Sequence, residues 1–235
     1  MINNIRSKGI AFLSLLVIFT LPAFVMAANP IGTVFSASGQ VYAKQKTAAA
    51  RGLRQRSSIF LQDTIIAKDN GRAQIKLADG TLLSIKPNTE FLIKEFKYNR
   101  KTAQKRKLVG KLFKGTLVGL SNQGSKADYQ LEGSMTKIIL HDNAGVVFRV
   151  LKHQENVGLF AGKISVQSKN KTKVLSNFKH NNYQAVVIKP NGAIDSYKGA
   201  LIQPIPIPAG TVYSMSEKKS EELKSIYNML RKPTS

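Results

Sequence analysis

The stretch RAQIKLADGTLLSIKPNTE, residues 72–90, decides the fold class. Apolar and polar side chains alternate along its first six residues, a pattern typical of a half-buried β-strand. Asp79-Gly80 follows, and this dipeptide readily adopts the positive φ angles of turns that join antiparallel strands. The stretch therefore predicts a β-hairpin in which one set of apolar side chains faces a common core: Ala73, Ile75, Leu77, Leu83 and Ile85.

Outward from this hairpin, residues 31–197 continue as short alternating runs separated by turn dipeptides such as Asn191-Gly192. Short strands at spacings near ten residues, without a helical period between them, are typical of an all-β sandwich, barrel or solenoid. A parallel α/β sheet would need crossover helices, and the pattern gives no sign of them. We therefore expect an all-β domain, a β-sandwich or β-helix-like fold, over residues 28–197. Further strands are expected at 32–35, 40–44, 64–67, 90–98, 111–120, 137–140, 146–151, 163–167 and 185–188.

The last part of the chain has a different character. Three alternating prolines in 204–208 remove hydrogen-bond donors and keep the backbone extended, so residues 198–213 are expected to form a Pro-rich strap along the domain. Residues 214–235 predict one C-terminal amphipathic helix, since Ser214 and Glu217 have capping-box spacing. Its apolar stripe falls at i, i+3, i+4 and i+7: Leu223, Ile226, Tyr227 and Leu230. We expect this stripe to pack on the β domain; a partner-binding or membrane-surface helix is the alternative.

The N-terminus, residues 1–27, is typical of a signal peptide. Arg6 and Lys8 precede an apolar run, Ile10 to Phe19, and Val25-Met26-Ala27 supplies small residues for cleavage after Ala27. An uncleaved membrane anchor is the alternative, but the apolar run is short for a bilayer. The chain has no Cys, which excludes a lipobox, disulfides and thiolate metal sites. We expect a periplasmic or secreted protein of the bacterial envelope, with no transmembrane anchor after cleavage.

Positive charge is the second informative property. The chain has 36 Lys and Arg against 13 Asp and Glu, a formal net charge of +23, which attracts polyanions. The cations are densest between Lys94 and Lys114, where Phe96, Tyr98 and Phe113 are interleaved and Glu95 is the one acid. As a hairpin, this segment would project its tip, Asn99 to Lys107, as a cationic finger able to contact phosphates. A merely solvated loop is the alternative. The predicted polyanion-binding residues are Arg100, Lys101, Lys105, Arg106 and Lys107.

Signals for catalysis are weak. His141, His153 and His180 lie in different segments without metal-ligand spacing, and neither a nucleophile elbow nor a phosphate-binding loop is present. His141-Asp142-Asn143 could orient an imidazole for acid–base chemistry, but the following Ala144-Gly145 favours a turn. The sequence alone does not exclude a pair of carboxylates placed as in a glycosidase. We expect no catalytic, cofactor-binding or metal-binding residues and no cofactor.

Several segments resemble the FecR-like domain, the periplasmic module of ferric-citrate-type sensor regulators that also occurs in stand-alone exported proteins. The resemblance is strongest in the first third of the domain and weaker towards Tyr197. It implies an all-β fold with sandwich or β-helix-like packing and a role in interaction. The matching segments are Gly32-Thr33-Val34, 38–41, 61–65, 69–75, 77–90, Phe96 with Tyr98, 111–115 and 158–166.

The chain departs from that family in two places. Only nine residues precede the apolar run, so we expect a stand-alone exported member without the anti-sigma segment. The family often has a Gly-x-Arg-Gly-Thr stretch before a later strand, whereas this chain has HDNAGVVF at 141–148.

The resulting hypothesis is an exported, non-enzymatic envelope protein with a FecR-like domain. Its expected partner is another envelope protein or an anionic polymer, either lipopolysaccharide or a wall polymer. A carbohydrate-active or wall-modifying enzyme is the first alternative, and two carboxylates meeting in a cleft would favour it. An extracellular DNA-binding module is the second, since nucleic acid could be met only outside the cell.

Overall fold

The computed structural model describes residues 29–99, 106–121, 127–141, 144–177 and 184–197. The expected all-β class is confirmed, since these residues form sixteen strands and no helix. None of the described residues lies in a helix long and apolar enough to cross a membrane. The signal peptide, the Pro-rich strap and the C-terminal helix expected from the sequence fall outside the described residues.

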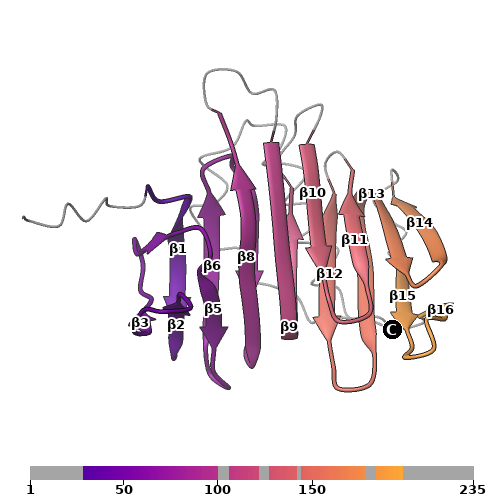
Figure 1. Ribbon diagram of the computed structural model, residues 1–235, viewed down its shortest axis with the longest axis horizontal. Coiled ribbons are helices and arrows are strands. Elements are labelled where there is room, and N and C mark those ends of the chain that lie inside the picture. The colour runs from indigo at the N-terminus through magenta and orange to yellow at the C-terminus, as the bar shows by residue number, and fades with distance from the viewer. Residues whose placement is uncertain (1–28, 100–105, 122–126, 142–143, 178–183, 198–235) are drawn as a thin grey trace, which may run out of the picture.

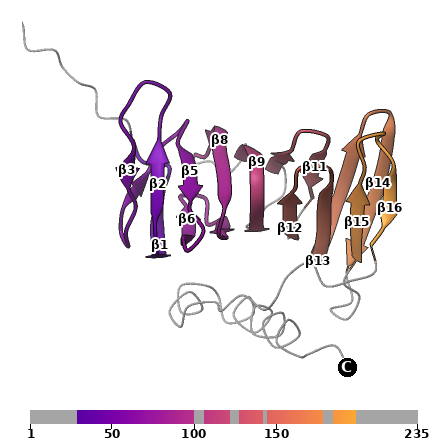
Figure 2. The same cartoon turned by 90° about the horizontal axis from the view of Figure 1, so that it is seen from below.

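Hydrogen-bonded pairing arranges the strands in two layers, which Figure 2 shows from below. The first layer, sheet A, has the order β4–β1–β6–β7–β9–β12–β13–β15–β16. Its strands are β4 (Ser58–Ile59), β1 (Gly32–Ser38), β6 (Arg72–Leu77), β7 (Leu82–Ile85), β9 (Arg106–Leu120), β12 (Gly145–Val150), β13 (Glu155–Ser168), β15 (Gln184–Ile188) and β16 (Ile194–Ser196).

The second layer, sheet B, has the order β3–β2–β5–β8–β9–β10–β11–β13–β14. Its additional strands are β3 (Arg51–Gly52), β2 (Val41–Lys44), β5 (Thr64–Ala67), β8 (Thr89–Lys97), β10 (Ala127–Glu132), β11 (Lys137–Leu140) and β14 (Lys171–Asn177). All pairs in the two sheets are antiparallel except β9 with β10. Figure 1 shows the strands side by side along the long axis, from β1–β3 at one end to β14–β16 at the other.

Two long strands belong to both layers. The first half of β9 pairs with β8 and β10 in sheet B, and its second half pairs with β7 and β12 in sheet A. Strand β13 crosses in the opposite direction, from β12 and β15 in sheet A to β11 and β14 in sheet B. The crossings occur at Gly115 (φ +91°) and Gly162 (φ +75°), in a backbone region where residues with a Cβ are strained. The two layers are therefore covalently continuous at the centre of the molecule.

The core lies between the layers and follows the predicted alternation. The expected core residues Ala73, Ile75, Leu77, Leu83 and Ile85 are all buried, which confirms that prediction. Residue Ala73 pairs with Ile85 and Ile75 pairs with Leu83, so the hairpin also has the expected register. Large side chains of sheet B, among them Phe91 and Tyr129, complete the same core.

Three fully buried carboxylates hold turns against this core. Asp79 accepts hydrogen bonds from the Thr81 amide (2.9 Å), the Thr81 hydroxyl (3.0 Å) and the Tyr129 hydroxyl (2.5 Å), which joins the β6–β7 turn to β10 in the other layer. Glu155 accepts from the Ser134 amide (2.7 Å), the Ser134 hydroxyl (2.7 Å) and the Met135 amide (3.1 Å).

Asp63 is the third of these carboxylates. It accepts a hydrogen bond from the Phe60 amide (2.8 Å) and is ion-paired with Arg51. Burying a carboxylate is costly unless such donors replace its water, so each of the three acids fixes the loop that supplies its donors.

The crossing at Gly115 gives a first prediction. A Cβ added there would lie 2.4 Å from Thr89 Oγ1 and 2.5 Å from the Asn88 carbonyl oxygen, whereas a Cβ at Gly52 would meet nothing within 4 Å. We expect Gly115→Ala to lower the free energy of unfolding by at least about 1–3 kcal/mol and Gly52→Ala to leave it nearly unchanged. Chemical denaturation of both variants measures this; equal stabilities would contradict the crossing geometry.

The Tyr129–Asp79 hydrogen bond gives a prediction on pH. Burial, and then the hydrogen bond to Asp79, raise the pKa of the Tyr129 phenol above its ordinary value of 10.0. The stability gained from the neutral phenol is therefore complete below pH 10.0 and is lost as the pH rises above it. Tyr129→Phe should cost about 1.5–3 kcal/mol at neutral pH. The difference between the two proteins should shrink in alkaline buffer, and a difference independent of pH would refute the assignment.

Candidate functional site: the basic β8–β9 hairpin

The surface of the protein is short of exposed carboxylates. The chain has only 13 acids for 36 cations, and Asp63, Asp79 and Glu155 are turned inward. Among the described residues, four other acids are in ion pairs with lysines: Glu90, Glu95, Glu132 and Asp195. An approaching anion therefore meets few exposed, unpaired carboxylates on the described surface.

The basic segment forms the hairpin expected from the sequence. Strands β8 and β9 pair with Leu92 opposite Lys111, Phe96 opposite Leu108 and Lys97 opposite Lys107. Two like charges lie directly opposite each other at the last of these pairs, an arrangement that is unfavourable in a sheet unless an anion is close. The two strands lie near the middle of the molecule (Figure 1).

The five predicted polyanion-binding residues fall into two groups. Arg100, Lys101 and Lys105 lie outside the described residues. Arg106 and Lys107 already belong to β9, where they are the first two residues after the connecting segment. We call this end of the two paired strands the base of the finger; it was expected to be part of the tip.

Both of these base residues contact their own hairpin. The Arg106 guanidinium lies 5.6 Å from the centre of the Tyr98 ring. Lys107 Nζ lies 2.8 Å from the Glu95 carboxylate. The hydrogen bond to Glu95 raises the pKa of Lys107, and the same bond lowers the pKa of Glu95. Residue Glu95 therefore neutralises part of the charge at the base.

Further along β9, away from the connecting segment, the outer side of the hairpin combines cations with an aromatic ring. Lys111 Nζ lies 5.3 Å from the centre of the Phe113 ring, which is exposed. Lys94 pairs with Glu132 of β10 at 2.7 Å, and Lys114 lies 3.9 Å from Glu90. The interleaving of cations and aromatic residues was visible in the sequence. The partner Glu132 was not, because it depends on the parallel pairing of β9 with β10.

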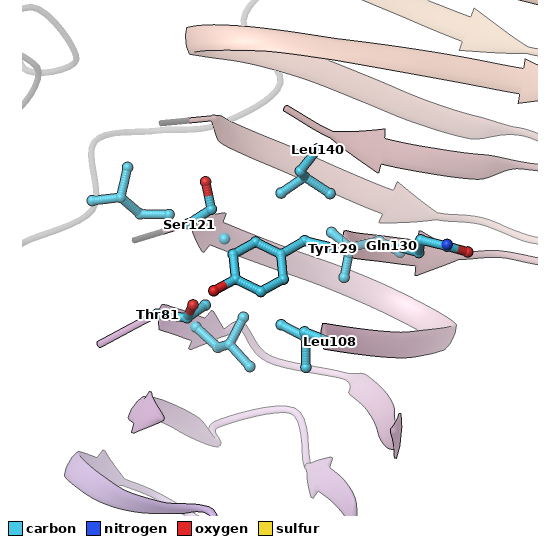
Figure 3. Close-up of a pocket in the computed structure, with 10 residues that line it drawn as sticks. Thr81, Leu108, Ser121, Tyr129, Gln130 and Leu140 are labelled. Carbon is cyan, nitrogen blue, oxygen red and sulfur yellow. The ribbon is translucent and has the colours of Figure 1, made fainter. Parts of the chain in front are cut away.

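Neither of two cavities formed by described residues is lined by a pair of carboxylates placed as in a glycosidase. One cavity, shown in Figure 3, lies beside Tyr129, whose hydroxyl points towards Thr81. Its volume is about 10 Å³, room for one water molecule at most. A second, open depression of about 360 Å³ follows the β10–β11 turn, and the acid that lines it, Glu132, is paired with Lys94.

The stretch His141-Asp142-Asn143, for which the sequence allowed an acid–base role or a turn, is described only at His141. His141 Nε2 lies 2.9 Å from Ser165 Oγ on the outer side of sheet B, while Asp142 and Asn143 fall outside the described residues. Within the described part of the chain, three or more His, Asp or Glu side chains do not gather where they could hold a metal ion.

Comparison with known proteins finds solved structures that match the chain at low sequence identity. Neither a protein-family model nor a curated protein matches the chain. Two crystal structures of a candidate anti-sigma factor from Parabacteroides distasonis ATCC 8503, at 2.50 and 1.65 Å resolution, share 12% and 14% sequence identity with it. Both give a TM-score of 0.47, covering 69% and 70% of this chain and 73% and 74% of the other. No residue role transfers at this level of similarity.

Proposed function

We propose that the chain is an exported, non-catalytic envelope protein with a FecR-like domain, and that it binds an anionic envelope polymer through the basic β8–β9 hairpin. Export is supported by the signal-peptide pattern of residues 1–27, and the FecR-like assignment by the segments between Gly32 and Glu90. Lipopolysaccharide and anionic wall polymers carry the phosphates or carboxylates that such a hairpin would recognise. A partner protein with an acidic face and extracellular DNA are the competing ligands.

The observation that carries the proposal is the concentration of like charge at the end of the hairpin. Lys97 and Lys107 lie opposite each other, and Arg106 is next to Lys107. Three further cations follow in the connecting segment, while Glu95 is the one acid between Lys94 and Lys114. The nine cations between Lys94 and Lys114 outnumber the acids that pair with three of them, and a polyanion would supply further counter-charge.

Salt-dependent binding tests the proposal. The full chain is titrated with lipopolysaccharide, an anionic wall polymer and duplex DNA over a salt series. A hairpin variant has Gln in place of the five cations Arg100, Lys101, Lys105, Arg106 and Lys107. A control variant has Gln at five exposed cations elsewhere: Lys44, Lys46, Lys68, Lys152 and Lys171.

We expect the hairpin variant to lose affinity, and each lost phosphate contact to lower the log–log salt slope for DNA by about 0.7–0.9. The control variant should keep most of its affinity. Equal losses in the two variants would mean that net charge alone attracts the polymer, and no loss in either would contradict the proposal. Because Arg106 and Lys107 have internal partners, Gln at Arg100, Lys101 and Lys105 alone should reproduce most of the effect.

A further inference from the structure

Sheet A is buried on both faces at β12 and at the first part of β13. Strands β6 and β7 alternate between buried and half-buried or exposed residues, as expected for a sheet with one face towards solvent. In β12, five of the six residues are buried, and in β13 the six residues from Glu155 to Phe160 are all buried. A strand buried on both faces requires a layer on each side.

The second buried face is an apolar patch on the outer side of sheet A. Its centre follows the strand register: Val118 of β9 lies opposite Val147 of β12, and Val147 lies opposite Gly158 of β13, which is opposite Ala185 of β15. Val147 is 0% exposed, although its neighbours Val146 and Phe148 point the other way, into the core between the sheets. We call this the outer apolar patch; it consists of Val118, Leu120, Val147, Phe160, Ala161, Ala185 and Tyr197.

We propose that residues 198–235 fold back over the outer apolar patch and form a third layer on sheet A. The chain reaches this position directly, because Tyr197 belongs to the patch and its amide donates to the Ala185 carbonyl (2.9 Å). From β15 to β9 the patch spans three inter-strand spacings, about 15 Å, which five extended residues can cover. The described strands all belong to the two sheets, so they do not supply this layer.

Other segments outside the described residues fit the patch less well. Residues 1–28 join the domain before β1, near the opposite end of sheet A from β15 and β16. The four internal segments, 100–105, 122–126, 142–143 and 178–183, have at most six residues each, too few to form a layer. Residues 198–235 are the longest of these segments, and they directly follow Tyr197, a residue of the patch.

The composition of residues 198–235 suits this face. The alternating prolines of 204–208 leave few amides to satisfy, so the apolar residues between them can cover a sheet face without pairing at its edge. The predicted helix adds the stripe Leu223, Ile226, Tyr227 and Leu230. The segment contains three acids, Glu217, Glu221 and Glu222, and six cations, so its fit to this face rests on its apolar residues.

Cations lie beside the outer apolar patch on the same side of sheet A. Arg72 of β6 neighbours Lys86 after β7, and Arg149 Nε of β12 lies 3.2 Å from Thr116 Oγ1 of β9. The Lys86 amide donates to the Thr116 carbonyl at 3.1 Å, so Thr116 sits between the two cations. Burial, and then repulsion by Arg72, lower the pKa of Lys86. Because residues 198–235 carry a net charge of +3, only an acid placed directly beside these two cations would offset this repulsion.

Cross-linking of the full chain tests the proposal. Because the chain has no Cys, only the introduced thiols can react. The test pair is Ser84→Cys with Ser225→Cys, because Ser84 lies opposite Val118 on the outer side of sheet A. The control pair is Ser165→Cys with Ser225→Cys, because Ser165 has the same mid-strand position on the outer side of sheet B. With a short bismaleimide, we expect intrachain cross-linking of the test pair several-fold above that of the control.

Thiol labelling gives a second measurement that does not depend on the position of Ser225. Val118→Cys should react slowly with a maleimide in the full chain, and Val174→Cys, at a side chain 53% exposed on sheet B, should react fast. Serine at Leu223, Ile226, Tyr227 and Leu230 should raise the labelling rate of Val118→Cys at least several-fold. Equal cross-linking of the two pairs, cross-links only between two chains, or an unchanged labelling rate would each overturn the proposal.

Discussion

Hydrogen bonding to buried carboxylates is the interaction on which the rest of the structure depends. Asp79 lies between the two layers and accepts from Thr81 in its own turn and from Tyr129 in the opposite sheet. Glu155 of sheet A repeats the arrangement with the β10–β11 turn of sheet B. A carboxylate without these donors would cost several kcal/mol to bury. The donors and the acids therefore hold each other in place, and with them the registers of two hairpins.

This use of acids also shapes the surface. A sandwich whose strands β9 and β13 cross between layers at glycines needs its turns held accurately, because each crossing fixes the register of both sheets. The three acids used inside the molecule do not neutralise surface cations, whereas Glu132, Glu95 and Glu90 pair with Lys94, Lys107 and Lys114 of the β8–β9 hairpin. The excess of cations itself is a property of the composition, with 36 Lys and Arg against 13 Asp and Glu.

The sequence predicted the local parts of this fold and missed the parts set by distant contacts. The β6–β7 hairpin was predictable because its alternation and its Asp-Gly turn are encoded within nineteen residues. The start of β9 was not, because residues up to Lys107 were assigned to the tip of the finger and the expected strand, 111–120, began too late. The first half of β13 was not, because the expected strand, 163–167, began only after the crossing point Gly162. Strands β10 and β14 were also missed; β14 is a lysine-rich edge strand, and among its residues Leu175 is buried while Val174 is exposed. The basic hairpin was predictable from its charge density. Its ion pairs, Lys107 with Glu95 and Lys94 with Glu132, were not, because they depend on how β8, β9 and β10 pair.

Hydrogen exchange at the turn amides measures the central interaction directly. The amides of Thr81, Ser134 and Phe60 donate to the three buried carboxylates, whereas the Ala48 amide donates to the Gln45 carbonyl in an exposed turn (3.2 Å). The account predicts that the first three exchange only when the whole domain unfolds, as amides in core strands do, and that Ala48 exchanges by local opening. Exchange of Thr81, Ser134 and Phe60 as fast as that of Ala48 would show that the buried carboxylates do not hold the turns.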